Sequence, residues 1–150
     1  MKKITFIEVI FIITACSPSK TVTQNTNDKY KTLTPPEGKA IVYFVRPSVV
    51  GTIIPFKVSC NDTLIGSTTG NKYLFIVLEP NTYNLISKAK AENDAELELK
   101  VDTGKKYFIE QKPKMGIFMA RNELILLNYE EGEQKLTKCS ISTKFTPPAF

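Results

Sequence analysis

Histidine is absent from this chain of 150 residues. Its absence excludes Ser-His and Cys-His nucleophilic pairs and removes the commonest zinc ligand. The seven glycines are scattered, so the sequence predicts no glycine-rich loop for binding phosphate. The 20 basic and 15 acidic side chains give a formal net charge of +5, but no dense basic run occurs, which argues against nucleic-acid binding. We therefore expect no catalytic residue, no metal and no cofactor.

Carboxylates are the remaining candidates for catalysis. Glu96 and Glu98 share one face of a predicted strand, and paired carboxylates serve in glycosidases. Lys100 continues the same row, so a solvated strand face with a cross-strand salt bridge is the favoured interpretation. Glu130 and Glu131 suit the acidic first turn of a short helix. We expect a protein that is not an enzyme and keep a carboxylate-based hydrolase as a lesser alternative.

Of the three cysteines, two lie far inside the chain, at Cys60 and Cys139. They are too far apart in sequence to form a metal knuckle by themselves. An oxidising compartment permits a disulfide between them. Two separate buried thiols are equally compatible with the sequence, because free cysteine behaves as a small apolar residue. Both alternatives stay open at this point.

The third cysteine, Cys16, directly follows an apolar segment. Lys2 and Lys3 precede a mostly Ile, Val and Phe run over residues 4–13. A charged start, a short apolar run and small residues near a cleavage site indicate a secretory signal peptide. The run is too short to span a membrane, which takes about 20 residues. Glu8 interrupts the apolar run, and we expect it to slow export.

The stretch Ile13-Thr14-Ala15-Cys16 resembles the lipobox of bacterial lipoproteins. The resemblance implies diacylglycerol on the Cys16 sulfur, cleavage of residues 1–15 and acylation of the new amino terminus. Several acyl chains hold a protein stably on a membrane, whereas a single chain does so only marginally. Ser17 stands where an inner-membrane retention signal would place Asp. By analogy with Gram-negative sorting, we expect anchoring at the outer membrane, facing the periplasm.

Composition then divides the chain further. Residues 17–39 are rich in Ser, Thr, Asn and Lys, which predicts a flexible tether. We predict a lipidated cysteine and linker over 16–37, one folded domain over 38–140 and a loose C-terminal tail over 141–150. The domain is long enough for one hydrophobic core.

Short apolar runs and turn signals alternate through the domain. Residues 40–46 and 73–78 are apolar on both faces, as expected for central strands. Asn61-Asp62 predicts a two-residue hairpin turn, and residues 92–94 predict a second hairpin. Further predicted turns lie at Glu79-Pro80-Asn81-Thr82, as a type II turn, at Asp102-Thr103-Gly104-Lys105 and at Arg121-Asn122, and a short helix is expected within residues 130–138.

About seven or eight short strands without a long helix predict an all-β fold, an antiparallel β-sandwich, with a β-barrel as the alternative. Arg46 ends the first predicted strand, where a surface salt bridge is the default and pairing with a carboxylate ligand is the alternative. Six aromatic residues at strand spacing are mostly core positions, although they have the chemistry of a carbohydrate-stacking platform. They are Tyr43, Phe44, Tyr73, Phe75, Tyr107 and Phe108.

Several short motifs follow one another in a characteristic order along residues 38–136. They are Arg46-Pro47, Asn61-Asp62 with Ile65-Gly66, Tyr73, Tyr83 with Leu85, and Gly104-Lys105 with Tyr107. This order resembles a set of bacterial lipoproteins known only as a domain of unknown function, similar to PEGA-type and carboxypeptidase-regulatory-type β-sandwich modules. The resemblance implies a fold and a compartment, and it implies no activity and no catalytic residues.

We expect a non-catalytic binding or structural module of the bacterial cell envelope, held at the membrane by lipid on Cys16. Its partner would be an envelope protein or peptidoglycan, and no nucleic acid. A glycan- or peptidoglycan-binding module is the main alternative.

Overall fold

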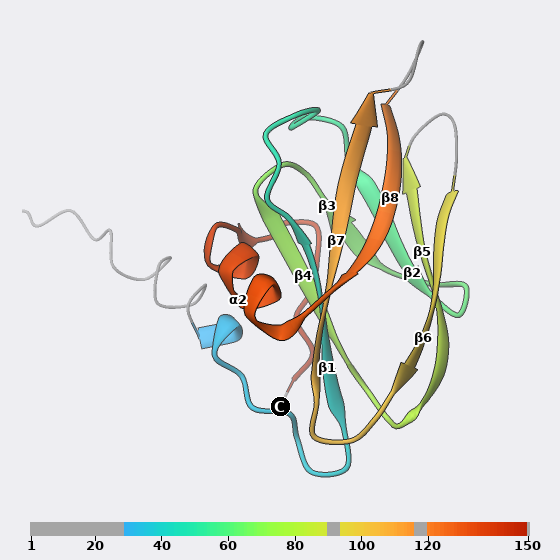
Figure 1. Cartoon of the computed structure of the whole chain (residues 1–150), viewed down its shortest axis with the longest axis vertical. Coiled ribbons are helices and arrows are strands. Elements are labelled where there is room, and N and C mark those ends of the chain that lie inside the picture. The colour runs from blue at the N-terminus through green and yellow to red at the C-terminus, as the bar shows by residue number, and fades with distance from the viewer. Residues whose placement is uncertain (1–28, 90–93, 116–119, 150) are drawn as a thin grey trace, which may run out of the picture.

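Two β-sheets pack face to face in the computed structural model, which describes residues 29–89, 94–115 and 120–149 (Figure 1). This arrangement confirms the predicted β-sandwich, with nine strands within the described ranges. The elements are β1 (Ala40–Arg46), β2 (Phe56–Cys60), β3 (Thr63–Thr68), β4 (Lys72–Leu78), β5 (Asn81–Ala89), β6 (Asp94–Val101), β7 (Lys106–Met115), β8 (Ala120–Leu127), α2 (Tyr129–Thr137) and β9 (Ser140–Ile141).

The five-stranded sheet has the order β8-β7-β1-β4-β9 and the four-stranded sheet the order β3-β2-β5-β6. The four-stranded sheet is antiparallel throughout. The five-stranded sheet contains two parallel pairs, β1 with β7 and β4 with β9, so the sandwich is predominantly rather than wholly antiparallel. Figure 1 shows α2 on the outer side of the five-stranded sheet, away from β5 and β6.

Strand β1 is buried along its whole length, as its two apolar faces predicted. Ala40, Val42 and Phe44 point into the core between the sheets. Ile41, Tyr43 and Val45 belong to a second cluster, on the other face of the same sheet. Because side chains alternate across a strand, one strand can serve two separate cores only when both faces are apolar.

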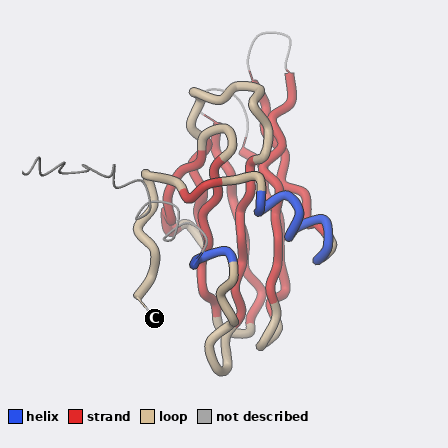
Figure 2. The backbone as a smooth tube through the Cα atoms, turned by 90° about the vertical axis from the view of Figure 1, so that its left-hand side faces the viewer, coloured by secondary structure: helices blue, strands red, loops and turns tan. Residues whose placement is uncertain are grey.

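The second cluster is covered by α2 and by the first described residues of the chain. Tyr30 packs on Phe75 with ring centroids 5.5 Å apart, and the Tyr43 hydroxyl donates a hydrogen bond of 2.7 Å to the Tyr30 carbonyl. The described part of the linker predicted over 16–37, which begins at residue 29, therefore packs against the folded domain. Figure 2 shows this short helical turn and α2 lying against the strands.

The C-terminal segment also contacts the strands, whereas it was predicted to be a loose tail. Ser140 and Ile141 form β9 beside β4. The Ser67 amide of β3 then donates to the Lys144 carbonyl over 3.2 Å, and Phe145 packs against both buried clusters. The segment thus runs from the edge of one sheet to the edge of the other, which covers part of β3.

Both predicted hairpins are confirmed, as is the turn predicted at Asp102-Thr103-Gly104-Lys105, which joins β6 to β7 with Gly104 at a φ of 74°. Asn61 and Asp62 have φ of 44° and 66° and join β2 to β3, as a two-residue hairpin requires. Strands β5 and β6 pair as the predicted second hairpin, although residues 90–93 lie outside the described residues. On β6 the hydrophobic residues Leu99 and Val101 are buried and the intervening charged residues are exposed, as the alternation predicted.

The predicted type II turn centred on Pro80-Asn81 is wrong. Asn81 is the first residue of β5, paired with Val101, and it is not among the described residues with positive φ. The physical reason is that β4 and β5 belong to different sheets. The chain therefore crosses from one sheet to the other at this point and does not reverse within one sheet.

The turn predicted at Arg121-Asn122 is also wrong, because both residues lie within β8. Asn122 pairs with Pro113 of β7. Pro113 lies beyond Glu110, where the pairing of β7 with β1 ends. Proline lacks a backbone donor, and here β7 needs to pair on one side only, so proline is compatible with the strand.

Helix α2 confirms the predicted short helix. The Asn128 side chain caps its N-terminus by accepting from the Glu131 amide over 2.9 Å, and Glu130 and Glu131 form the acidic first turn. The Lys135 ammonium lies 2.6 Å from the Glu110 carboxylate and ties the helix to β7. Within the described ranges, no helix is long and apolar enough to cross a bilayer.

Gly132 brings α2 close to the sheet. A Cβ atom at this position would overlap the ring of Phe108 on β7, well inside van der Waals contact. Any larger residue must therefore displace either the helix or a buried ring of the second cluster.

Gly132→Ala tests this contact. In an open helix the change would add up to about 1 kcal/mol of stability through propensity. Here the overlap with Phe108 costs about 1–3 kcal/mol, so we expect a net loss of roughly 1–2 kcal/mol in the free energy of unfolding by urea. Gln134→Ala, exposed on the same helix, is the control and should change stability by less than about 0.5 kcal/mol. A variant at Gly132 more stable than the parent would contradict the close packing.

Candidate functional site

Arg46, the last residue of β1, is completely buried, with 0% of its surface exposed. The sequence predicted a surface salt bridge at the end of a strand, with a carboxylate ligand as the alternative. Both interpretations are wrong for this side chain. Its guanidinium instead points into the end of the sandwich, where backbone carbonyl groups surround it.

Three carbonyl oxygens accept hydrogen bonds from the guanidinium. Nη1 donates to Ile54 over 2.6 Å and to Thr68 over 3.3 Å, and Nη2 donates to Gly51 over 2.8 Å. The guanidinium carbon also lies 3.8 Å from the centre of the Phe56 ring. These partners come from β2, from β3 and from the loop over residues 47–55, so one side chain of the five-stranded sheet holds the opposite sheet and the loop.

Burial is the dominant electrostatic influence on this residue. It lowers the pKa of the Arg46 guanidinium to about 10, which leaves the group charged at neutral pH. Carbonyl dipoles and the face of an aromatic ring both stabilise a desolvated cation. The buried charge is thus stabilised by dipoles and a ring.

The loop over residues 47–55 is pinned to its surroundings. The Gly70 amide donates to the Thr52 carbonyl over 3.0 Å, and a Cβ atom on Gly70 would lie 2.8 Å from the Ser48 carbonyl oxygen. Despite these contacts the loop leaves three aliphatic side chains in solvent. They are Val49, Val50 and Ile53, which are 68%, 49% and 90% exposed.

A polar network lies near Arg46 in the otherwise apolar interior. The Thr68 hydroxyl donates to the Gln111 side-chain oxygen over 2.5 Å, and the Gln111 amide donates to the Ser87 hydroxyl over 2.8 Å. All three side chains are fully buried. Thr68 and Ser87 belong to the four-stranded sheet and Gln111 to β7, so the network links the sheets across the core.

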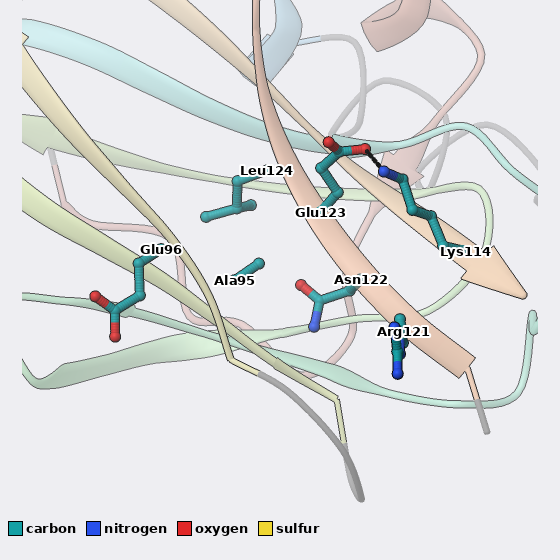
Figure 3. Close-up of a pocket in the computed structure, with 7 residues that line it drawn as sticks. All are labelled: Ala95, Glu96, Lys114, Arg121, Asn122, Glu123 and Leu124. Carbon is teal, nitrogen blue, oxygen red and sulfur yellow. Dashed lines mark ion pairs between the residues drawn. The ribbon is translucent and has the colours of Figure 1, made fainter. Parts of the chain in front are cut away.

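A separate polar cleft opens between β6 and β8, the edge strands on one side of the sandwich (Figure 3). It has a volume of about 440 Å³. The Lys114 ammonium lies 2.7 Å from the Glu123 carboxylate, and the two form an ion pair at one side of the cleft. The lining residues are Ala95, Glu96, Lys114, Arg121, Asn122, Glu123 and Leu124.

The two carboxylates that the sequence paired, Glu96 and Glu98, stay on one face of β6 but differ in their relation to the cleft. Glu96 lines the cleft, and Glu98 is not among its lining residues. Both remain exposed on the outer row of β6. An ion pair of this hairpin joins Lys88 and Asp94, with 2.8 Å between the ammonium nitrogen and a carboxylate oxygen. Glu123, on β8, is the carboxylate that the fold brings to the same cleft as Glu96, and no sequence signal marked it.

The predicted aromatic core is confirmed. Tyr43, Phe44, Tyr73, Phe75 and Phe108 are buried. Tyr107 is half-buried and packs against the core between the sheets. These rings are therefore packing residues and not an exposed stacking platform.

Cys60 and Cys139 are both buried, free thiols. Cys60 belongs to the core between the sheets, whereas Cys139 belongs to the cluster beneath α2. Burial raises the pKa of both thiols, that of Cys139 to about 11, so both are protonated at neutral pH. The structure thus has the separate-thiol arrangement, and Cys16, the predicted lipidation site, lies outside the described residues.

No group of three or more Cys, Asp or Glu side chains arranged to hold a metal ion occurs in the described part of the chain. Two candidate functional features remain. One is the Arg46 clamp, meaning the buried guanidinium with its carbonyl partners and the apolar loop over 47–55. The other is the charged cleft between β6 and β8.

These features define a small predominantly antiparallel β-sandwich whose interior is organised around a buried arginine. The family described as "Protein of unknown function (DUF2846)" matches residues 36–124, and the chain belongs to it. A relative named "Uncharacterized protein" from Haemophilus influenzae (strain ATCC 51907 / DSM 11121 / KW20 / Rd) is 24% identical over 139 residues, which cover 91% of this chain and 81% of the relative. No solved structure matches the chain.

Arg46→Met tests the clamp. Methionine relieves the cost of burying a charge but leaves carbonyl acceptors unsatisfied, at about 1–3 kcal/mol for each fully buried group. We expect a net loss of roughly 3 kcal/mol in the free energy of unfolding by urea, together with faster proteolysis in the loop over 47–55. Lys100→Met, exposed on β6, should stay within about 0.5 kcal/mol of the parent. An Arg46→Met protein of parental stability would refute this role.

Proposed function

We propose that this protein is a lipid-anchored lipoprotein of the bacterial envelope, attached through Cys16 and acting without catalysis as a binding or structural module. We place it at the outer membrane, facing the periplasm. The observation that carries the proposal is the order of Lys2-Lys3, the apolar run over 4–13 and the lipobox ending at Cys16. The folded domain is consistent with this role because it presents a rigid sandwich with an exposed loop and cleft.

The docked linker sets how far the domain sits from the lipid. Tyr30 is already held on the sandwich, which leaves residues 17–28 as the tether. The composition of these 12 residues predicts a tether, and a chain of this length and type has a root-mean-square span of roughly 20 Å. The domain would then remain within about one protein diameter of the membrane.

Replacement of Cys16 by serine tests the anchor. Labelled palmitate should be incorporated into the parent and lost completely in Cys16→Ser, because serine lacks the sulfur that carries diacylglycerol. The serine variant should also leave the outer-membrane fraction. Cys60→Ser is the matched control and should keep the label, since its thiol is buried in the core. A parent protein without label would refute the lipoprotein proposal.

The cleft between β6 and β8 supports a second candidate, binding of peptidoglycan. Its lining combines carboxylates at Glu96 and Glu123 with cationic groups at Lys114 and Arg121. Peptidoglycan stem peptides carry both amino and carboxylate groups, so such a lining offers partners for each. The third alternative, a carboxylate-based hydrolase, would use Glu96 in the same cleft.

Sedimentation with purified sacculi separates these candidates. A peptidoglycan binder should co-sediment, and Arg121→Gln or Glu96→Gln should weaken co-sedimentation at least about tenfold, which corresponds to 1.4 kcal/mol. Lys100→Gln, outside the cleft, should have no effect. Release of soluble fragments that stops with Glu96→Gln would favour the hydrolase. Absence of co-sedimentation would leave the anchored adaptor as the proposed function.

A further inference from the structure

Among the described residues, the loop over 47–55 carries the most exposed large apolar side chain. Ile53 is 90% exposed, and Val49 and Val50 flank it within the same loop. Aliphatic side chains exposed singly need no explanation, but three within five residues concentrate apolar surface on one loop, here called the tip. The tip lies at the end of the sandwich where β1 ends and β2 begins.

The tip is held by the buried Arg46 guanidinium and by backbone hydrogen bonds of the loop. Arg46 binds the Gly51 and Ile54 carbonyls on either side of Ile53, and the Ile54 amide donates to the Gly51 carbonyl over 3.0 Å. Gly51 has a φ of 62°, a conformation that glycine adopts without strain. Binding through the tip therefore requires little ordering of the backbone.

The charge around the tip is positive. Residues 46–57 and 67–72 pack against each other there and contain three basic residues but no carboxylate. Arg46 is completely buried, so Lys57 and Lys72 supply the charge at the surface. Beside the loop lies a depression of about 380 Å³, lined by Pro55, Lys57, Lys88 and Ala89. Lys57 is exposed at its rim, while Lys88 is paired with Asp94. The surroundings therefore favour an anionic partner.

A lipid surface fits these observations better than a protein partner. A standard protein interface buries about 800 Å² on each side and needs matched shapes, whereas the tip offers three side chains. A bilayer needs no matched shape: aliphatic groups enter the acyl boundary while lysines contact anionic headgroups. We infer that the tip at Val49, Val50 and Ile53 inserts into an anionic bilayer, the one that holds the lipid on Cys16.

The inference rests on the proposed lipid anchor, and the geometry permits both contacts. Tyr30 is docked at Tyr43, three residues before Arg46 on β1, so about 10 Å of strand separates the docking point from the start of the loop. The tether predicted from composition over residues 17–28, with a span of roughly 20 Å, would allow the lipid and the tip to reach one bilayer. The sandwich would then be oriented by two contacts with the membrane.

Single tryptophans provide the test, because the chain contains no natural tryptophan. Ile53→Trp places the reporter at the tip. Leu64→Trp is the matched control, since Leu64 is 59% exposed beside the Asn61-Asp62 turn at the other end of β2 and β3. Both full-length lipidated proteins are purified in detergent and reconstituted into phosphatidylcholine–phosphatidylglycerol vesicles, with and without brominated acyl chains.

We expect a blue shift of emission and strong quenching by brominated chains for Ile53→Trp, and neither for Leu64→Trp. Adding Val50→Asp to Ile53→Trp should abolish the quenching while the protein still floats with the vesicles. Vesicles without phosphatidylglycerol should quench the tip reporter less, through loss of the contact with Lys57.

Three results would overturn the inference. Floating protein with no quenching at the tip, or with equal quenching of both reporters, would show that the loop has no preferred contact with lipid. A concentration-dependent blue shift without bromine quenching would identify a second copy of the chain as the partner. Failure of both variants to float would instead refute the lipid anchor and, with it, this inference.

Discussion

A positive charge inside a β-sandwich must be stabilised without water, and that constraint organises one end of this protein. The Arg46 guanidinium recruits carbonyls of Gly51, Ile54 and Thr68 and lies on the Phe56 ring. Each partner is backbone or a core ring, so the loop, the start of β2 and the end of β3 must all take one conformation before these contacts can form together. A single side chain thereby couples the two sheets to the loop that joins β1 and β2.

The two buried clusters divide the remaining packing. The core between the sheets is continuous with the polar network of Thr68, Ser87 and Gln111, which gives the facing sheets a specific register. The second cluster depends on covers that come from both ends of the described chain, residues near Tyr30 and helix α2. Sheet and covers together explain why β1 is apolar on both faces. They also explain why Gly132 carries no side chain.

Local patterns in the sequence were sufficient for the fold class, the hairpin at Asn61-Asp62, the alternation of β6 and the short helix, because each depends on neighbours in the chain. Long-range placement was not predictable from them. From the sequence, an arginine that ends a strand is expected at the surface, and only the fold shows that carbonyls of a loop and of the opposite sheet surround it. Likewise the sequence pattern identified Glu96 as one of a pair on β6. It did not predict that Glu123, on β8, lines the same cleft, because that depends on how the two sheets pack.

The parallel pairings have a consequence for the order in which the chain folds. Strand β1 needs β7, about sixty residues later, and β4 needs β9, formed by Ser140 and Ile141 near the end of the chain. Pairings between distant segments close slowly, because loop-closure entropy is lost before contacts are gained. The five-stranded sheet is therefore completed only after synthesis has passed Ile141. A polypeptide connected in this way stays unfolded longer during synthesis, in the form that a translocation channel can thread.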